Sequence, residues 1–169
     1  MTKFLDMKSL LYSFCSLALV ILLACSEPPV YPDEPIIELV NLSKTSMQQS
    51  FVSTVDSILV TLSFTDGDGD IGSEPGDSSS SVLYIDKRQN ELQPLRVIPT
   101  VGDIGVGKGI SGEIFVILPT TCCINVATGA TCQRSPGTTD EVIYEMWIVD
   151  RAGNESNRIE LPPITLRCE

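Results

Sequence analysis

Residues 57–70 read SILVTLSFTDGDGD, and they join the clearest strand pattern of the chain to its densest group of carboxylates. Apolar side chains at positions 58, 60, 62 and 64 alternate with mostly polar ones. This period of two indicates a strand with one buried face. Asp66, Asp68 and Asp70 follow at once and are separated by glycines.

Other segments of the chain repeat this short-strand pattern. They are residues 36–42, 82–87, 95–98, 112–118, 142–149 and 159–166, and residues 45–53 read as a polar connection. Pro162 and Pro163 interrupt the last segment, which is typical of an edge strand or a bulge. About seven short strands without helical periodicity predict an all-β, immunoglobulin-like β-sandwich. In that fold Tyr144 suits a tyrosine corner, and Trp147 is a packing residue more readily than a ligand platform.

The N-terminal residues have the features of a secretory signal. Lys3 and Lys8 precede an apolar run over residues 10–24, which is short for a membrane-spanning helix. The end of this run, Leu-Leu-Ala before Cys25, resembles a bacterial lipoprotein signal. The resemblance implies a signal peptide at residues 1–24 and a lipid on Cys25. An uncleaved membrane anchor is the alternative.

The residues after Cys25 predict a tether before the folded domain. Residues 26–35 read SEPPVYPDEP, and four prolines and three acids favour an extended, solvated chain. We therefore expect a tether over residues 25–35 and the sandwich over residues 36–169. Two acyl chains with an amide-linked third are enough for stable membrane attachment. By analogy with other lipoproteins, Ser26 after the lipidated cysteine favours the outer membrane.

The charge of the chain excludes several function classes. It carries 11 Lys and Arg against 22 Asp and Glu, and removing residues 1–24, with two Lys and one Asp, changes the net charge from −11 to −12. So acidic a protein is not suited to nucleic acid or to an anionic lipid surface, whereas divalent cations are natural partners. The chain has no histidine, which removes the usual nucleophile–base pairs and zinc ligand sets. We therefore expect no enzyme, with a carboxylate-pair glycosidase as the alternative.

Nucleotide binding is also not expected. Residues 102–108 read GDIGVGK and match part of a phosphate-binding loop. Residue 109 is glycine where the motif needs Ser or Thr, and a strand pattern follows where it needs a helix.

Four cysteines of the mature chain predict two disulfides. Export to an oxidising compartment favours bonds among Cys122, Cys123, Cys132 and Cys168. The adjacent Cys122 and Cys123 are poor partners for each other, so each is expected to bond one of the other two, in an order left open. A zinc site is the weaker alternative because its cysteines usually come as separated pairs.

The carboxylates after residue 65 predict a calcium site. Calcium takes six to eight oxygen ligands in adaptable geometry, and glycines let a loop fold tightly around an ion. An EF-hand is rejected because Ile71 stands where its glycine belongs, Asp77 where its glutamate belongs, and no helices flank the loop. Ordinary Asp-Gly turns are the alternative.

Sandwich topology predicts the remaining ligands of this site. The loops after the second and sixth strands lie at the same end of an immunoglobulin-like sandwich. The loop after residue 149 reads DRAGN, with Asp150 and Asn154 as its oxygen donors. The loop with Asp103, and the segment with Asp33 and Glu34, should approach the same end.

Taken together, these motifs resemble a known family. The lipoprotein-like signal, the Pro-rich tether, a strand running into DGDGDIG and a late strand running into DRAGNES look like small immunoglobulin-like lipoproteins of Bacteroidota. The DRAGN turn is also similar to turns of bacterial immunoglobulin-like and cadherin-like domains. The resemblance implies metal ligands at Asp66, Asp68, Asp70, Asp150 and Asn154.

The expected function is that of a non-catalytic accessory protein on the outer membrane. A calcium-stabilised sandwich would present its loops to a protein partner or an outer-membrane complex. The alternative is a glycan-binding module of a polysaccharide-uptake system, with Tyr84 and Trp147 as its aromatic platform.

Overall fold

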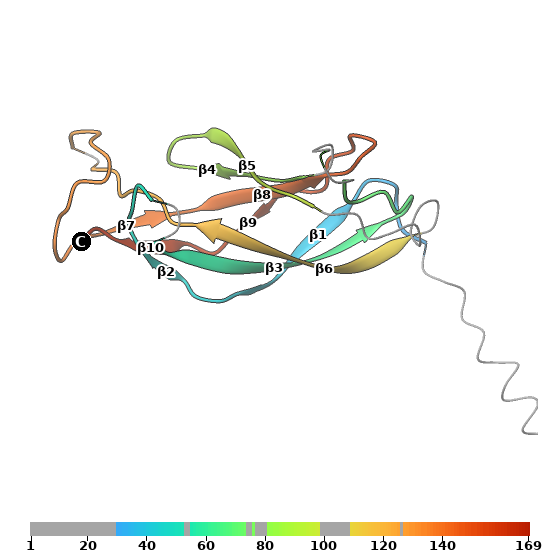
Figure 1. Cartoon of the computed structure of the whole chain (residues 1–169), viewed down its shortest axis with the longest axis horizontal. Coiled ribbons are helices and arrows are strands. Elements are labelled where there is room, and N and C mark those ends of the chain that lie inside the picture. Colours follow the sequence, from blue (N-terminus) through green and yellow to red (C-terminus); the bar gives the residue numbers. More distant parts are fainter. Residues whose placement is uncertain (1–29, 53–54, 74–75, 77–80, 99–108, 126) are drawn as a thin grey trace, which may run out of the picture. The chain divides into compact units, whose positions relative to one another are not determined.

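A computed structural model describes residues 30–52, 55–73, 76, 81–98, 109–125 and 127–169, with the backbone alone for residues 94–97. Tyr31–Glu169 forms one compact unit. The described residues contain strands and no helix, so the predicted all-β class is confirmed (Figure 1). The predicted signal peptide, Cys25 and Asp103 lie outside the described residues.

Ten strands make up the described part of the domain. They are β1 (Ile36–Leu42), β2 (Ser46–Gln48), β3 (Ser57–Asp66), β4 (Ser81–Asp86), β5 (Glu91–Val97), β6 (Ile110–Pro119), β7 (Thr139–Val142), β8 (Tyr144–Val149), β9 (Ile159–Glu160) and β10 (Ile164–Arg167).

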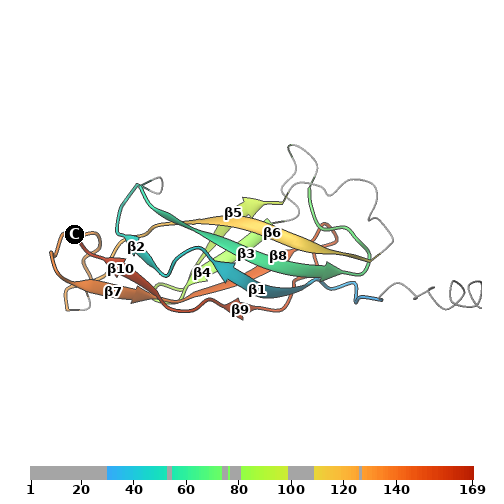
Figure 2. The same ribbon diagram turned by 90° about the horizontal axis from the view of Figure 1, so that it is seen from below.

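These strands form three sheets arranged as a β-sandwich. One sheet has the order β1-β3-β6, and the second has the order β5-β4-β8-β9. The third, β2-β10-β7, lies at the end of the sandwich that carries the C-terminus (Figures 1 and 2). The buried side chains of all three sheets form one hydrophobic cluster.

Strand β3 is central to this core. Its alternating apolar side chains are buried, and its ten residues pair with all of β6 on one side while β1 pairs with the other. Leu62 has no solvent exposure. Burial of such a side chain contributes about 1.5–3 kcal/mol, and Leu62→Ala would cost about 2–5 kcal/mol because a cavity would remain.

Two segments predicted as single strands are each divided in the structure. Residues 142–149 divide at Ile143 into β7 and β8, and residues 159–166 divide at the two prolines into β9 and β10. In both cases the chain changes sheet: β9 pairs with β8, whereas β10 pairs with β7 and β2. Pro162 and Pro163 have no N–H to donate, so a ladder cannot continue through them.

The expected polar connection at residues 45–53 contains the short strand β2. It pairs in parallel with β10 over three residues. Three residues show no usable periodicity, so only the pairing defines this strand.

Two aromatic residues pack as expected. Tyr144 is buried and meets Tyr84 edge to face, with ring centroids 5.5 Å apart. Burial raises the pKa of Tyr144, and the Asp86 carboxylate adds to this effect. Trp147 is also buried, with the Arg158 guanidinium 3.9 Å from its ring centroid.

Candidate metal centre

Two loops meet at the end of the sandwich where β3 and β8 end. Asp66 is the last residue of β3, and Asp150 directly follows β8. Each of Asp66, Asp68, Asp70 and Asp150 offers a carboxylate oxygen, and these oxygens lie within 4.8 Å of one another. The expected meeting of the two acidic loops is therefore observed. We call these four residues the acidic cluster.

Asp150 is held by its own turn. Its Oδ1 accepts hydrogen bonds from the amides of Gly153 and Asn154, at 2.7 and 2.8 Å. The Asn154 side-chain amide donates to Oδ2 at 2.8 Å. Gly153 has a φ of 92°, which favours glycine. Asn154 thus orients Asp150, and its role as a metal ligand stays a prediction.

The loop after β3 is fixed to the loop after β8 and to the core. The Ala152 amide donates to Asp70 Oδ2 at 2.9 Å, and Arg151 Nε donates to the Asp70 carbonyl at 2.9 Å. The buried Ile71 belongs to the hydrophobic core, and its amide donates to Asp66 Oδ2 at 3.1 Å. Ile71, which stands where an EF-hand needs glycine, therefore anchors the loop after β3 to the hydrophobic core of the sandwich.

Three carboxylate oxygens of the acidic cluster have no hydrogen-bond partner among the residues that the structure describes. They are Oδ1 of Asp66, Asp68 and Asp70, and all three are buried. None of the ion pairs found in the described residues involves the acidic cluster. An unsatisfied buried polar group costs about 1–3 kcal/mol, and a charged one costs more. The arrangement is therefore unfavourable unless a cation or a proton compensates it.

The pKa values of Asp66 and Asp70 reflect the uncompensated negative charge of the acidic cluster. Burial raises the pKa of Asp66 to about 6, and repulsion from Asp68 and Asp70 adds to it. Burial also raises the pKa of Asp70, followed by repulsion from Asp150 and Asp68. A bound cation would reverse these effects because it favours the ionised form of each carboxylate.

The donors of the acidic cluster fit a hard metal ion. Carboxylate oxygens suit magnesium, calcium or manganese, whereas zinc and copper sites rely on imidazole or thiolate. The chain has no histidine, and the four cysteines of the domain are in disulfides. The cluster of four aspartates can therefore hold a metal ion.

The N-terminal segment reaches this end through its backbone. Asp33 and Glu34 are exposed and do not belong to the acidic cluster. Instead, the Gly67 amide donates to the Pro32 carbonyl at 2.7 Å. This contact could not be predicted, because a backbone carbonyl acceptor leaves no mark in the sequence.

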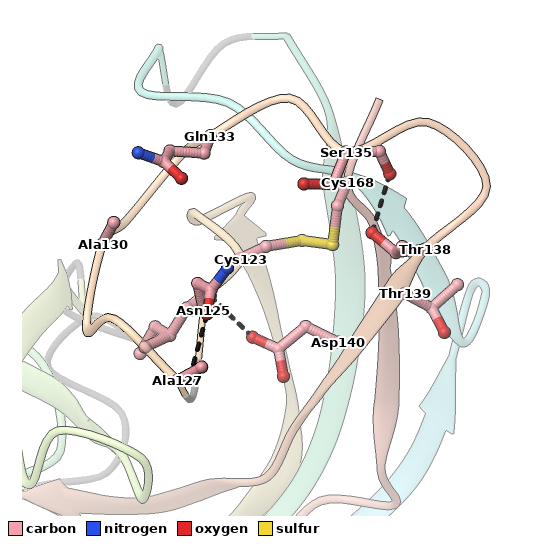
Figure 3. Close-up of a pocket in the computed structure, with 11 residues that line it drawn as sticks. Cys123, Asn125, Ala127, Ala130, Gln133, Ser135, Thr138, Thr139, Asp140 and Cys168 are labelled. Atoms are coloured by element: carbon pink, nitrogen blue, oxygen red, sulfur yellow. Dashed lines mark hydrogen bonds between the residues drawn. A yellow bond between two sulfur atoms is a disulfide. The ribbon is translucent and has the colours of Figure 1, made fainter.

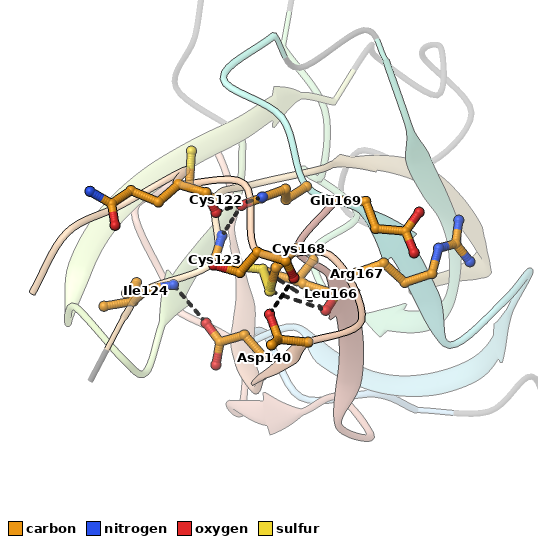
Figure 4. Close-up of a disulfide and its surroundings, with 12 residues drawn as sticks. Cys122, Cys123, Ile124, Asp140, Leu166, Arg167, Cys168 and Glu169 are labelled. Carbon is orange, nitrogen blue, oxygen red and sulfur yellow. Dashed lines mark hydrogen bonds between the residues drawn. A yellow bond between two sulfur atoms is a disulfide. The ribbon is translucent and has the colours of Figure 1, made fainter. Parts of the chain in front are cut away.

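The opposite end of the sandwich is closed by the two disulfides. They join Cys122 to Cys132 and Cys123 to Cys168, with Cα atoms 4.6 and 5.8 Å apart. Figure 4 shows the Cys123–Cys168 bond. Each of the adjacent cysteines thus has its own partner, and the order left open by the sequence is decided. The second bond ties the C-terminus beneath the loop that follows β6.

An arginine also neutralises two carboxylates at the disulfide end. Arg88 contacts Asp86 at 2.5 Å and Asp140 at 2.6 Å, and donates to the Cys122 carbonyl at 3.3 Å. Asp140 also accepts from the Ile124 amide at 2.9 Å (Figure 4). Sequence reasoning missed this network, because Asp140 is 52 residues away from Arg88 along the chain.

A cavity of about 330 Å³ lies beside the Cys123–Cys168 bond. Figure 3 shows Asn125, Asp140 and Thr138 around it. Asn125 accepts hydrogen bonds from the amides of Ala127 and Thr128, and Asp140 is paired with Arg88. Oδ1 of Asn125 and the Asp140 carboxylate are thus occupied in holding the loops around the cavity.

Comparison with known proteins adds no relative. The chain matches no protein-family model, no curated protein and no solved structure. Within the described residues, no helix is long and apolar enough to span a membrane.

Proposed function

We propose that this protein is a non-catalytic accessory protein, anchored to the outer membrane by a lipid on Cys25. Its sandwich domain would be stabilised by calcium and would present one face to a protein partner. The observation that carries the calcium part is the convergence of three buried, unpartnered carboxylate oxygens within one cluster of four aspartates.

Calcium suits this cluster better than the other hard cations. Calcium–oxygen bonds are about 2.3–2.6 Å long, so oxygens on opposite sides of the ion lie about 5 Å apart. Oxygens of the acidic cluster separated by up to 4.8 Å agree with that spacing. Magnesium demands nearly ideal octahedral geometry at about 2.0–2.1 Å, which loops of this kind are less suited to supply.

The burial of the site supports a structural role for the ion. The unpartnered oxygens of Asp66, Asp68 and Asp70 are buried, so an ion among them would be enclosed by the loops. An enclosed ion has little open coordination for a substrate or a reactive water. Together with the lack of histidine in the sequence, this favours stabilisation over catalysis.

The anchoring part of the proposal rests on the sequence. The basic start, the apolar run and the Leu-Leu-Ala-Cys ending at Cys25 are the features of a lipoprotein signal. The proline-rich residues that follow suit a tether that leads into the compact unit beginning at Tyr31.

An exposed apolar patch supports binding of a protein partner. Leu59 on β3 lies opposite Ile117 on β6, and Phe115 lies on the same strand. The three side chains are 42%, 58% and 54% exposed. Contiguous apolar side chains on a sheet face are typical of interfaces. Because the chain is strongly acidic, we expect a partner surface with basic groups around an apolar centre.

A glycan platform has less support. Trp147 is buried beneath Arg158, and Tyr84 packs against Tyr144. Stacking on a sugar ring requires an exposed aromatic face, so these two residues do not favour the glycan-binding alternative. The protein-partner proposal is preferred for this reason.

Co-purification tests the partner proposal. The lipidated protein is isolated from envelope extracts in calcium, together with a Phe115→Ser/Ile117→Ser variant. A matched control is Leu92→Ser, which alters a similarly exposed residue on β5. We expect a stoichiometric partner with the wild type and the control, and its loss in the double variant. A wild-type protein that is always isolated alone would overturn the proposal.

A further inference from the structure

The segment of residues 31–35, which we call the N-terminal segment, docks on a glycine of the acidic loop. Besides the hydrogen bond from the Gly67 amide to Pro32, the two backbones are in close contact. A Cβ atom on Gly67 would lie 2.4 Å from the Tyr31 carbonyl oxygen and 2.5 Å from that of Pro32. Such distances are too short for any side chain, so only glycine allows this docking.

The Tyr31 ring packs against a second glycine, Gly109. A Cβ atom on Gly109, just before β6, would lie 2.9 Å from a ring carbon of Tyr31. Tyr31 is half-buried in this position. The N-terminal segment is thus seated between the acidic loop and the start of β6.

Strand β1, which follows the N-terminal segment, has separate attachments. It pairs with β3, and the Ile37 backbone exchanges two hydrogen bonds with the Asn157 side chain, at 2.8 and 2.9 Å. These contacts do not involve the acidic cluster. Loss of order in the acidic loop would therefore release residues 31–35 without releasing β1.

The position of Gly67 depends on the ion site because of its neighbours. It lies between Asp66 and Asp68, and each of these two residues offers a carboxylate oxygen to the acidic cluster. An ion bound among these oxygens would draw both carboxylates to one centre and would hold the intervening amide where it donates to Pro32. Without a cation, four like charges within 4.8 Å repel one another and the loop loses this constraint.

We infer that occupancy of the acidic cluster by calcium controls docking of the N-terminal segment and so sets how far the domain reaches from its membrane anchor. This inference rests on the calcium site and the lipid anchor proposed above. Release of residues 31–35 would lengthen the free chain before β1 by five residues, or at most about 18 Å.

Residue-resolved NMR on the mature lipidated protein in detergent micelles tests this coupling. Amide exchange of Gly67 and backbone order of Asp33 and Glu34 are measured in calcium and after its removal by chelator. With calcium we expect Gly67 exchange to slow by about tenfold or more. Order parameters of the segment should be near 0.85 with calcium and below about 0.6 without it.

Two variants separate docking from ion binding. Gly67→Ala keeps the four carboxylates but blocks the docking site, so calcium should still bind, measured by calorimetry, while the segment stays mobile. Asp68→Asn keeps the docking site but weakens ion binding, so the segment should be mobile at calcium levels that order it in the wild type. The intact pairing of β1 with β3 serves as an internal control for folding in both.

The outcomes distinguish this inference from the function on which it rests. Calcium that binds the wild type without changing Gly67 exchange or segment order overturns the coupling and leaves the calcium site intact. A docked segment in Gly67→Ala also overturns it. If the wild type binds no calcium at all, the proposed calcium site fails and the coupling fails with it.

Discussion

The two ends of the sandwich bury carboxylates in opposite ways. At the disulfide end, Asp86 is 7% exposed and Asp140 is partly buried, and Arg88 lies between them. At the other end, Asp66 and Asp150 are fully buried beside Asp68 and Asp70, with no cationic side chain in an ion pair among the described residues.

This difference shows that the buried carboxylates of the disulfide end are neutralised by a side chain of the protein itself, without a ligand. Burial disfavours the charge of Arg88, but its hydrogen bonds and attraction to Asp86 and Asp140 outweigh burial and raise its pKa. Two disulfides add covalent closure at the same end. Among the described residues no ion pair and no disulfide involves the acidic cluster. The attraction of Arg151 for Asp70 does not outweigh the burial and the repulsion that raise the Asp70 pKa, so stability at this end should depend on a cation from outside the chain. We therefore expect the two ends to respond differently to metal, charge removal and pH.

The largest effect is expected from removing the internal cation. Arg88→Met leaves two buried carboxylates uncompensated and should lower the free energy of unfolding by about 3 kcal/mol. The loss should be equal in calcium and in chelator, because Arg88 is remote from the acidic cluster. Chemical denaturation measures it.

Lys87→Met is the matched control for that variant. Lys87 pairs with Glu160 at the surface, and both side chains are well exposed, so little change in stability is expected. A calcium-dependent loss in Arg88→Met would contradict the independence of the two ends.

Calcium binding to the acidic cluster is expected to change the free energy of unfolding by a somewhat smaller amount. Calcium at about 100 times its dissociation constant should stabilise the fold by about 2.7 kcal/mol, which raises the melting temperature by several degrees. Asp68→Asn should remove most of this shift. In chelator the same variant should melt no lower than the wild type, because it relieves repulsion within the acidic cluster. Equal melting curves with calcium and with chelator would contradict the expectation that the acidic end, unlike the disulfide end, is stabilised by an added cation.

The smallest effect is a pH dependence of the metal-free protein. The pKa of Asp66 is raised from 3.8 to about 6 in the folded state, so the folded protein holds this proton more tightly than the unfolded chain. The Asp66 contribution to stability should therefore rise as the pH falls from 7 towards 4, by at most about 1.4 kcal/mol per pH unit.

Asp66→Asn isolates this contribution from those of other carboxylates. Denaturation curves of metal-free wild type and variant, prepared over chelating resin, are compared at pH 7.5 and 5.5. The wild type should gain stability relative to the variant at the lower pH. A relative loss would mean that the Asp66 carboxylate is stabilised in its ionised form without any metal.

Strong local patterns allowed much of the fold to be predicted. The bounds of β1 agree with the expected residues 36–42, and β3 extends the expected strand by one residue. Short strands that depend on pairing were not predictable. β2 exists because Ser46–Gln48 meets β10, and β7 is separated from β8 because the chain changes sheet at Ile143.

The sequence also predicted the aspartates of the acidic cluster, but not the backbone contacts that hold them. The aspartates follow strands of recognisable pattern, so fold topology was enough to bring Asp66 and Asp150 together. The supporting contacts were not predictable, because the Ala152 amide, the Pro32 carbonyl and the Ile71 amide are backbone groups without a distinctive residue type.

The sequence by itself determined an all-β chain, an acidic end built from two Asp-rich loops, and four cysteines for two disulfides. These features follow from local properties that can be recognised in the sequence: the alternation of apolar residues, the turn-forming glycines and the chemistry of the side chains. The tertiary structure alone decided which cysteines pair, that Arg88 neutralises one end, and that Gly67 carries the N-terminal segment. These features depend on distances between residues far apart in the chain, which only packing of the two main sheets around one core brings about.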